Sequence, residues 1–210
     1  MSEAAADSAE TERLLERVQS GNERAFEQLF ARHRSYIRRV VALRLDPVLR
    51  QRVDESDVVQ ETQLEAFRRL DDYLARRPMP FRLWLRQTAE KRLGMLRRGH
   101  GAARRSVERE VQLPNRSSLA LAQQLMASGL SPSAQFDQHE LARLVRVAVA
   151  KLADSDRELI IMRMYERLTN EEIACVLGID QAAMRQRYGR ALLRLRKMLV
   201  ESGLTDHSSR

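Results

Sequence analysis

The chain has 210 residues, 43% of them hydrophobic, and a net charge of +8. This length supports two small domains with cores of their own but is short for three. No apolar run reaches the roughly 20 residues that span a bilayer, and the acidic first twelve residues are unlike the basic start of a secretory signal. We therefore expect a cytoplasmic protein with no membrane insertion. The single cysteine, Cys175, excludes an internal disulfide.

Positive charge is concentrated in two segments. Residues 76–109 carry a local charge of +9 and residues 181–199 one of +6, so the rest of the chain is net −7. Two surfaces that face polyanions are the natural interpretation. Two solvated helix faces are the alternative.

Apolar residues recur every three or four positions, which predicts an all-α fold without a sheet. The predicted domains are a helical bundle over 12–98 and a helix-turn-helix domain over 138–200. The linker over 99–137 has only a weak helical pattern at 119–126, and residues 1–11 and 201–210 are predicted to be disordered. The predicted helices cover 12–19, 22 to about 45, 54–73, 81–98, 139–152, 155–165, 170–177 and 181–200.

A helix-turn-helix is the most specific local pattern. Thr169 and Glu172 form a capping box at the start of one helix. Gly178 suits the positive backbone angle of a tight turn, and Asp180 can cap the next helix. An ordinary helical hairpin is the alternative. Cys175, in the apolar first helix, is interpreted as a packing residue.

The second helix of this motif has two different faces. Met184 and Leu195 lie on the side expected to pack inward, together with Tyr188, which could instead stack on a base. Arg185 and Gln186 are left outward, and such side chains make bidentate contacts to guanine and adenine edges in the major groove.

An acidic stripe occupies the N-terminal half. Asp57, Glu61 and Glu65 step by four residues along one face of a predicted helix. A stripe of this kind repels DNA. It could bind a basic protein surface or be a solvated face.

The following helix has the opposite character. Phe81, Trp84 and Leu85 form an apolar stripe beside several arginines. Basic residues interleaved with aromatic ones are typical of surfaces that bind single-stranded DNA. Trp84 is interpreted as a core residue, with base contact as the alternative.

Catalysis is not expected. The histidines are scattered and the acids line an exposed stripe, so the sequence offers no metal site, no nucleophile with a base and no cofactor site. A nucleic-acid-processing enzyme is therefore disfavoured, while a free-standing helix-turn-helix regulator stays open as an alternative.

Taken together, these segments resemble a known family. Residues 14–26, 57–62 and 81–86 are similar to region 2 of the sigma-70 family, extracytoplasmic-function (ECF) group, and residues 152–196 are similar to region 4. The Arg-rich and Ser/Pro-containing linker resembles that of the planctomycete-type group. The resemblance implies a sigma factor that binds core RNA polymerase and promoter DNA, both duplex and melted, and an anti-sigma factor or other regulator is a further candidate partner.

The resemblance also implies roles for particular residues. The candidate polymerase-binding residues are Asp54, Asp57, Val58, Gln60, Glu61 and Glu65. Those expected at the melted minus-ten element are Arg82, Trp84, Arg86, Lys91, Arg92, Arg97 and Arg98. Those expected at the minus-35 element are Thr169, Gln181, Arg185, Gln186, Arg187 and Arg190.

Two short segments depart from the family pattern. Thr88-Ala89-Glu90-Lys91 stands where the family usually has Ile-Ala-Arg-Asn, and Gly94-Met95 replaces an apolar-Asp pair. A cation thus replaces an amide that the family often uses near the unpaired minus-ten base. We expect strand binding to be kept, whereas the base preference at the minus-ten element does not follow from the resemblance.

Overall fold

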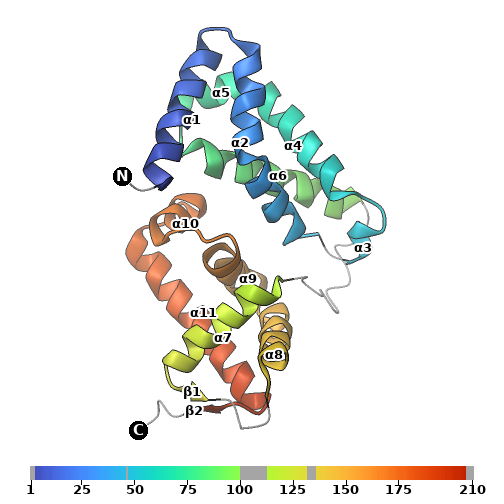
Figure 1. Cartoon of the computed structure of the whole chain (residues 1–210), viewed down its shortest axis with the longest axis vertical. Coiled ribbons are helices and arrows are strands. Elements are labelled where there is room, and N and C mark those ends of the chain that lie inside the picture. Colours follow the sequence, from blue (N-terminus) through green and yellow to red (C-terminus); the bar gives the residue numbers. More distant parts are fainter. Residues whose placement is uncertain (1–2, 46, 100–112, 132–135, 207–210) are drawn as a thin grey trace. The chain divides into compact units, whose positions relative to one another are not determined.

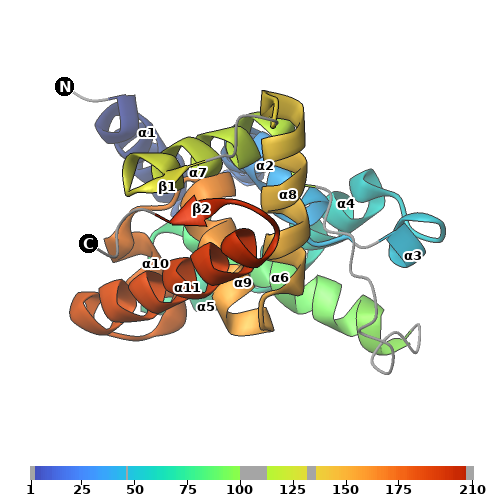
Figure 2. The same cartoon turned by 90° about the horizontal axis from the view of Figure 1, so that it is seen from below.

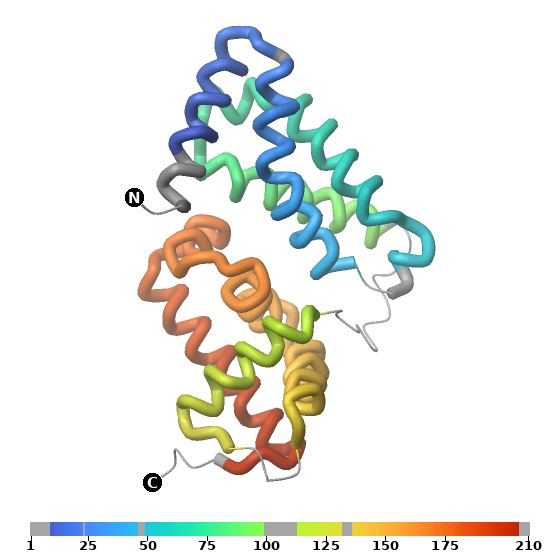
Figure 3. The backbone as a smooth tube through the Cα atoms, in the orientation of Figure 1, coloured from blue at the N-terminus to red at the C-terminus, as the bar shows by residue number. Residues whose placement is uncertain are grey.

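The computed structural model describes residues 3–45, 47–99, 113–131 and 136–206, and the chain divides into two compact units near residue 105. Figure 3 follows the first unit from blue to green and the second from yellow-green to red. Both units are helical, which confirms the predicted all-α fold class. The Arg-rich segment 104–110 of the predicted linker lies outside the described residues.

The first unit is a bundle built around the second helix (Figure 1). Its elements are α1 (Glu3–Gln19), α2 (Glu23–Ala42), α3 (Pro47–Arg50), α4 (Glu55–Arg68), α5 (Leu70–Arg76) and α6 (Phe81–Gly99). Asn22 caps α2 as predicted, its side chain accepting a hydrogen bond from the Ala25 amide at 3.2 Å. Because α2 packs against α1, α4 and α6, its apolar face, including Phe30 and Ile37, is fully buried.

An aromatic cluster closes one end of this bundle. Phe81 and Trp84 of α6 pack against Tyr73 of α5, with ring centroids 4.7 to 5.5 Å apart. Burial raises the pKa of Tyr73 to about 12, so its hydroxyl stays protonated and donates to the Met79 carbonyl at 3.1 Å. The cluster fixes the start of α6 against the end of α5.

Two boundaries of the first unit differ from the prediction. The helix expected over 54–73 is divided at Arg69, which ends α4 and precedes α5 with a non-helical backbone. Helix α1 begins at Glu3, so residues 3–11 are helical rather than disordered. Thr11 explains part of this difference, because its buried hydroxyl lies 3.3 Å from His33 Nε2 and connects α1 to α2.

The second unit contains the remaining helices (Figure 2). They are α7 (Asn115–Ala127), α8 (Gln138–Lys151), α9 (Asp154–Ile160), a π-helical turn η2 (Ile161–Tyr165), α10 (Asn170–Leu177) and α11 (Gln181–Glu201). Strands β1 (Leu130–Ser131) and β2 (Thr205–Asp206) pair antiparallel. The sequence pattern predicts no sheet, and this two-residue pair is the only β-structure among the described residues.

Helix α7 corrects the predicted linker. Leu121 and Leu125 are buried where α7 packs on α8 and η2, and the Ser118 hydroxyl lies 3.0 Å from that of Tyr165. Burial raises the pKa of Tyr165 to about 12, so this phenol stays neutral. The second unit therefore begins before α8, because an apolar face in the segment assigned to the linker belongs to its core.

The predicted disordered tail also needs correction over its described part. Leu204 is buried and β2 pairs with β1, so residues 201–206 belong to the folded unit, while residues 207–210 lie outside the described residues. No helix of the described chain is both long enough and apolar enough to cross a membrane.

We predict that Leu121→Ala lowers the free energy of unfolding of the second unit by about 2–5 kcal/mol, because it leaves a cavity between α7 and α8. Urea unfolding followed by circular dichroism measures this change. Gln123→Ala, at an exposed position of the same helix, is the matched control. Equal stability of the two variants would show that α7 does not belong to the core.

Candidate protein and nucleic-acid interfaces

The acidic stripe lies on α4. Asp54 caps the helix by accepting a hydrogen bond from the Ser56 amide at 2.6 Å, and this bond holds the pKa of Asp54 below its usual value. Asp57 and Gln60 are exposed, and Glu61 and Glu65 are partly exposed. These five predicted positions are therefore accessible. Val58 is a correction: it is fully buried in the bundle and offers no side-chain surface to a partner.

Two apolar side chains on α4 were missed by the sequence reasoning. Leu64 is 53% exposed and Phe67 49% exposed, although Phe67 also contacts Phe26 with ring centroids 5.1 Å apart. The available signal was their spacing, because Gln60, Leu64 and Phe67 fall at i, i+4 and i+7 on one helix face. Neighbouring large apolar groups exposed on one helix face mark a candidate protein-binding surface.

Five of the predicted minus-ten residues of α6 keep at least part of their surface exposed: Arg82, Lys91, Arg92, Arg97 and Arg98. Lys91 and Arg98 are exposed. The Arg82 guanidinium lies over the Tyr36 ring, 5.0 Å from its centroid. Arg92 pairs with Glu61, its Nε 2.6 Å from Glu61 Oε2.

Three of the predicted minus-ten residues make contacts inside the bundle. Trp84 is buried in the aromatic cluster, which favours its interpretation as a core residue. Arg86 is fully buried, and we remove both side chains from the candidate DNA surface. Arg97 donates to the Arg44 carbonyl at 2.7 Å and is partly exposed.

Arg86 is buried within a charge cluster between α6 and the turn that follows α2. Glu90 binds Arg86 at 2.8 Å through one oxygen and lies 3.2 Å from Arg44 Nε through the other. Both arginine side chains are at most 5% exposed, whereas that of Glu90 is 30% exposed. The carboxylate thus compensates two buried cations at a position where the resembled family usually has an arginine.

We predict that Glu90→Ala lowers the free energy of unfolding of the first unit by about 3 kcal/mol, because it leaves two guanidinium groups buried without this carboxylate. Chemical unfolding of purified variants measures the loss. Lys91→Ala changes the adjacent exposed position and should leave stability nearly unchanged. A similar small effect for Glu90→Ala would mean that solvent or other groups compensate the arginines.

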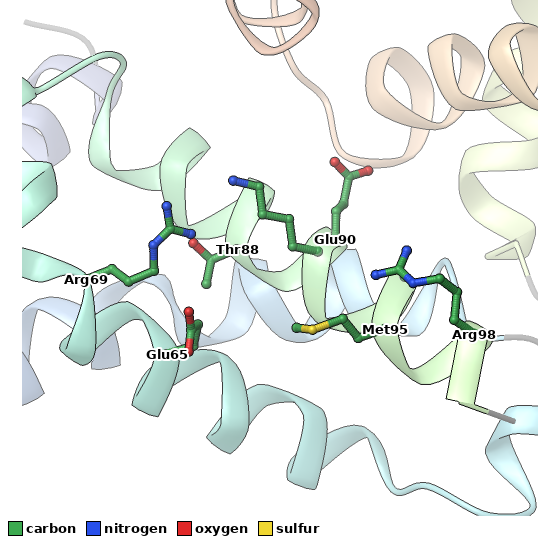
Figure 4. Close-up of a pocket in the computed structure, with 8 residues that line it drawn as sticks. Glu65, Arg69, Thr88, Glu90, Met95 and Arg98 are labelled. Atoms are coloured by element: carbon green, nitrogen blue, oxygen red, sulfur yellow. The ribbon is translucent and has the colours of Figure 1, made fainter.

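A cavity of about 540 Å³ lies between α4 and α6. Figure 4 shows side chains from both helices around it, with Thr88 and Met95 on α6 facing Glu65 and Arg69 at the end of α4. Lys91, Gly94 and Arg98 complete much of the lining. Three residues that differ from the family pattern therefore line one hollow beside the basic surface of α6: Lys91, Gly94 and Met95.

The helix-turn-helix has the predicted local geometry. The Thr169 hydroxyl accepts from the Glu172 amide at 3.1 Å while the Glu172 carboxylate accepts from the Thr169 amide at 2.8 Å, which confirms the capping box. Gly178 has a φ of 62° and ends α10. Asp180 then caps α11 by accepting from the Ala183 amide at 2.7 Å. These caps fix the angle at which α11 leaves the turn.

The outer face of α11 carries five of the six predicted minus-35 residues, and the sixth, Thr169, caps α10. All of them are exposed: Thr169, Gln181, Arg185, Gln186, Arg187 and Arg190. On the opposite face, Met184 and Leu195 are fully buried. Arg194, one turn after Arg190, pairs with the buried Asp156 of α9. The helix is thus anchored through one side and presents cations and an amide on the other.

Two residues of this unit whose roles the sequence left open, Tyr188 and Cys175, are partly buried and suit packing better than a reactive role. Tyr188 is partly buried, and its burial raises the pKa of its phenol. Burial, together with Glu172 and Glu171, raises the pKa of the Cys175 thiol. A raised pKa disfavours the thiolate that reactive cysteines need. Within the described ranges, no three His, Cys, Asp or Glu residues gather where they could hold a metal ion.

Comparison with known proteins decides the family. Residues 142–195 match the family model "Sigma-70, region 4". The RNA polymerase sigma factor CnrH of Cupriavidus metallidurans is 33% identical over 187 residues, which cover 89% of this chain and 92% of that protein. This chain belongs to the RNA polymerase sigma factors of the sigma-70 family. It therefore acts in transcription initiation, which favours the sigma factor over the free-standing regulator.

Other relatives of this sigma factor agree. The probable RNA polymerase sigma factor RfaY of Xanthomonas campestris is 30% identical over 69% of this chain and 34% of that protein. The solved structure of CnrH in complex with the cytosolic domain of CnrY covers 94% of this chain and 99% of that one, with 29% identity and a TM-score of 0.57. The structure of the sigma factor RpoE with the anti-sigma factor NepR from Bartonella quintana covers 83% of this chain and 96% of that one; at 19% identity and a TM-score of 0.51 it supports the fold alone.

Proposed function

We propose that this sigma factor, a member of the ECF group acting in the cytoplasm and with no catalysis of its own, binds core RNA polymerase through α4 and promoter DNA through α6 and α11. The observation that carries the proposal is the separation of charge: exposed acids on α4, and exposed cations on α6 and on the outer face of α11. Like charges repel, so the acidic face suits a protein and the basic faces suit DNA.

The docking surface on α4 combines charge with apolar area. We define the α4 surface as Asp57, Gln60, Glu61, Leu64 and Phe67. Its acids attract a basic partner surface, and its two exposed apolar side chains supply area that gains from burial on binding. The exposure of Leu64 and Phe67 favours a protein-binding surface over a purely solvated acidic stripe.

We predict that the double reversal of Asp57 and Glu61 to Lys lowers initiation in run-off transcription more than tenfold, because it sets like charges against a basic partner. The assay uses core polymerase and genomic fragments, with binding to core measured in parallel. Reversal of Asp71 and Asp72 to Lys, two exposed acids of α5, makes the same change in net charge and serves as control. Unchanged initiation by the α4 double variant would contradict docking through this surface.

The outer face of α11 is proposed to read the minus-35 element. Arg185 and Gln186 are exposed near the start of the helix, where side chains of a recognition helix reach base edges. Arg187 and Arg190, farther along the helix, suit phosphates, which position the protein without reading sequence. Because two separate DNA contacts are held at promoter spacing by polymerase, weak DNA binding by the isolated chain is compatible with this proposal.

We predict that Arg185→Ala changes the choice among upstream promoter sequences, with about a tenfold loss on the preferred one, since a bidentate base contact contributes about 1–3 kcal/mol of discrimination. Holoenzyme competition among templates that differ only in the upstream element measures it. Lys197→Ala, at an exposed position near the end of α11, is the control. Equal loss on every template would identify Arg185 as a phosphate contact instead.

The basic surface of α6 is proposed to hold the melted minus-ten strand. Arg82, Lys91, Arg92 and Arg98 form this strand-binding set, which leaves out the buried Trp84 and Arg86 and also Arg97, whose guanidinium donates to the Arg44 carbonyl. The cavity beside Lys91 and Arg98 has Met95 in its lining, so its chemistry differs from the amide and carboxylate that the resembled family usually has there. We therefore expect a different base preference at this element.

We also propose a regulatory partner for this chain and its membership of the planctomycete-type group. Two solved neighbours are complexes, of CnrH with the cytosolic domain of CnrY and of RpoE with the anti-sigma factor NepR. They support an anti-sigma factor or similar regulator as a partner of this chain. The linker composition that resembles the planctomycete-type group, including residues 104–110, supports membership of that group.

A further inference from the structure

One ion pair connects the two proposed surfaces of the first unit. Arg92 Nε lies 2.6 Å from Glu61 Oε2, between α6 and α4. The arginine side chain is 30% exposed and that of the glutamate 42% exposed. Both partners are therefore accessible to a competing charge from outside.

Each partner belongs to a different proposed surface. Glu61 is part of the α4 surface, and Arg92 is part of the strand-binding set. While they are paired, the glutamate lowers the attraction of Arg92 for phosphate and the arginine lowers the attraction of Glu61 for a basic protein surface.

We propose that the Glu61–Arg92 pair is a mutual mask that couples the two binding events: core polymerase takes Glu61 and thereby releases Arg92 for DNA phosphates. This inference rests on the proposed function, because it needs α4 to bind polymerase and α6 to bind DNA. Coupling of this kind is reciprocal, so DNA bound to Arg92 increases the affinity for polymerase by the same factor.

The surroundings of the pair favour a local effect. One turn further along α4, Glu65 lines the cavity together with Lys91 and Arg98. Arg92 follows Lys91 in α6, so release of Arg92 adds positive charge next to a cation that lines this hollow. Because both members are partly exposed, the expected coupling is modest, about two- to fivefold in affinity.

The test measures binding of the isolated full-length chain to a fluorescein-labelled single-stranded oligonucleotide at low salt by fluorescence anisotropy. Glu61→Gln should increase affinity about two- to fivefold over the unsubstituted chain, because it unmasks Arg92. Asp72→Asn, which removes an equal charge from an exposed position of α5, gives the effect of net charge alone. Comparison of the two variants isolates the local contribution of the pair.

A double-mutant cycle decides the mechanism. In an Arg92→Gln background, Glu61→Gln should gain no more affinity than Asp72→Asn does. The proposal is overturned if Glu61→Gln increases oligonucleotide affinity as much in the Arg92→Gln background as in the unsubstituted chain. It is also overturned if the affinity gain of Glu61→Gln never exceeds that of Asp72→Asn. Absence of oligonucleotide binding by both the chain and its Glu61→Gln variant overturns it as well.

Failure of this inference is distinguishable from failure of the proposed function. The mutant cycle is measured without polymerase, so its outcome does not depend on docking through α4. Run-off transcription by the double reversal of Asp57 and Glu61 reports on docking. If the mutant cycle shows no coupling between Glu61 and Arg92 but the double reversal loses initiation, the docking surface stands and the mask is rejected. If the double reversal keeps its activity in initiation, the docking surface is rejected.

Discussion

The packing of α6 against α2 and α4 is the constraint on which the first unit depends. Its apolar side buries Leu83, Leu85 and the aromatic cluster, and its charged side is held by Glu90 between two buried arginines. Once these contacts fix the rotation of α6 about its own axis, Lys91 and Arg98 face solvent and Arg92 meets α4. One helix therefore serves as core and as the proposed DNA surface, and its rotation decides which arginine is buried and which is exposed.

Sequence patterns predicted this arrangement well where the cause was local. The capping box at Thr169, the turn at Gly178 and the cap at Asp180 each involve neighbours within three residues, and all three are present. Periodicity also separated the buried Met184 from the exposed Arg185. These features need no knowledge of distant parts of the chain.

Patterns failed where the cause was a distant partner. Arg86 looked like a surface cation because the packing of α6 against the distant helices α2 and α4, rather than its own neighbours, buries it. Val58 followed the resembled motif although it faces the core. The face of α7 looked too weak to predict a folded helix because α8 and the Tyr165 hydroxyl, far along the chain, complete it. The spacing of Leu64 and Phe67 placed them on the face of Gln60, but their exposure became clear only from the packing of the bundle.

Helix α7 and the β1/β2 pair also change where the C-terminal domain can be cut. The family model begins at residue 142, yet α7 covers apolar surface on α8 and β2 joins the end of the described chain to the residue after Gly129. A fragment trimmed to the matched region would present leucine and valine side chains to water. Such a fragment would self-associate, and a faithful isolated domain has to run from before Leu113 to Asp206.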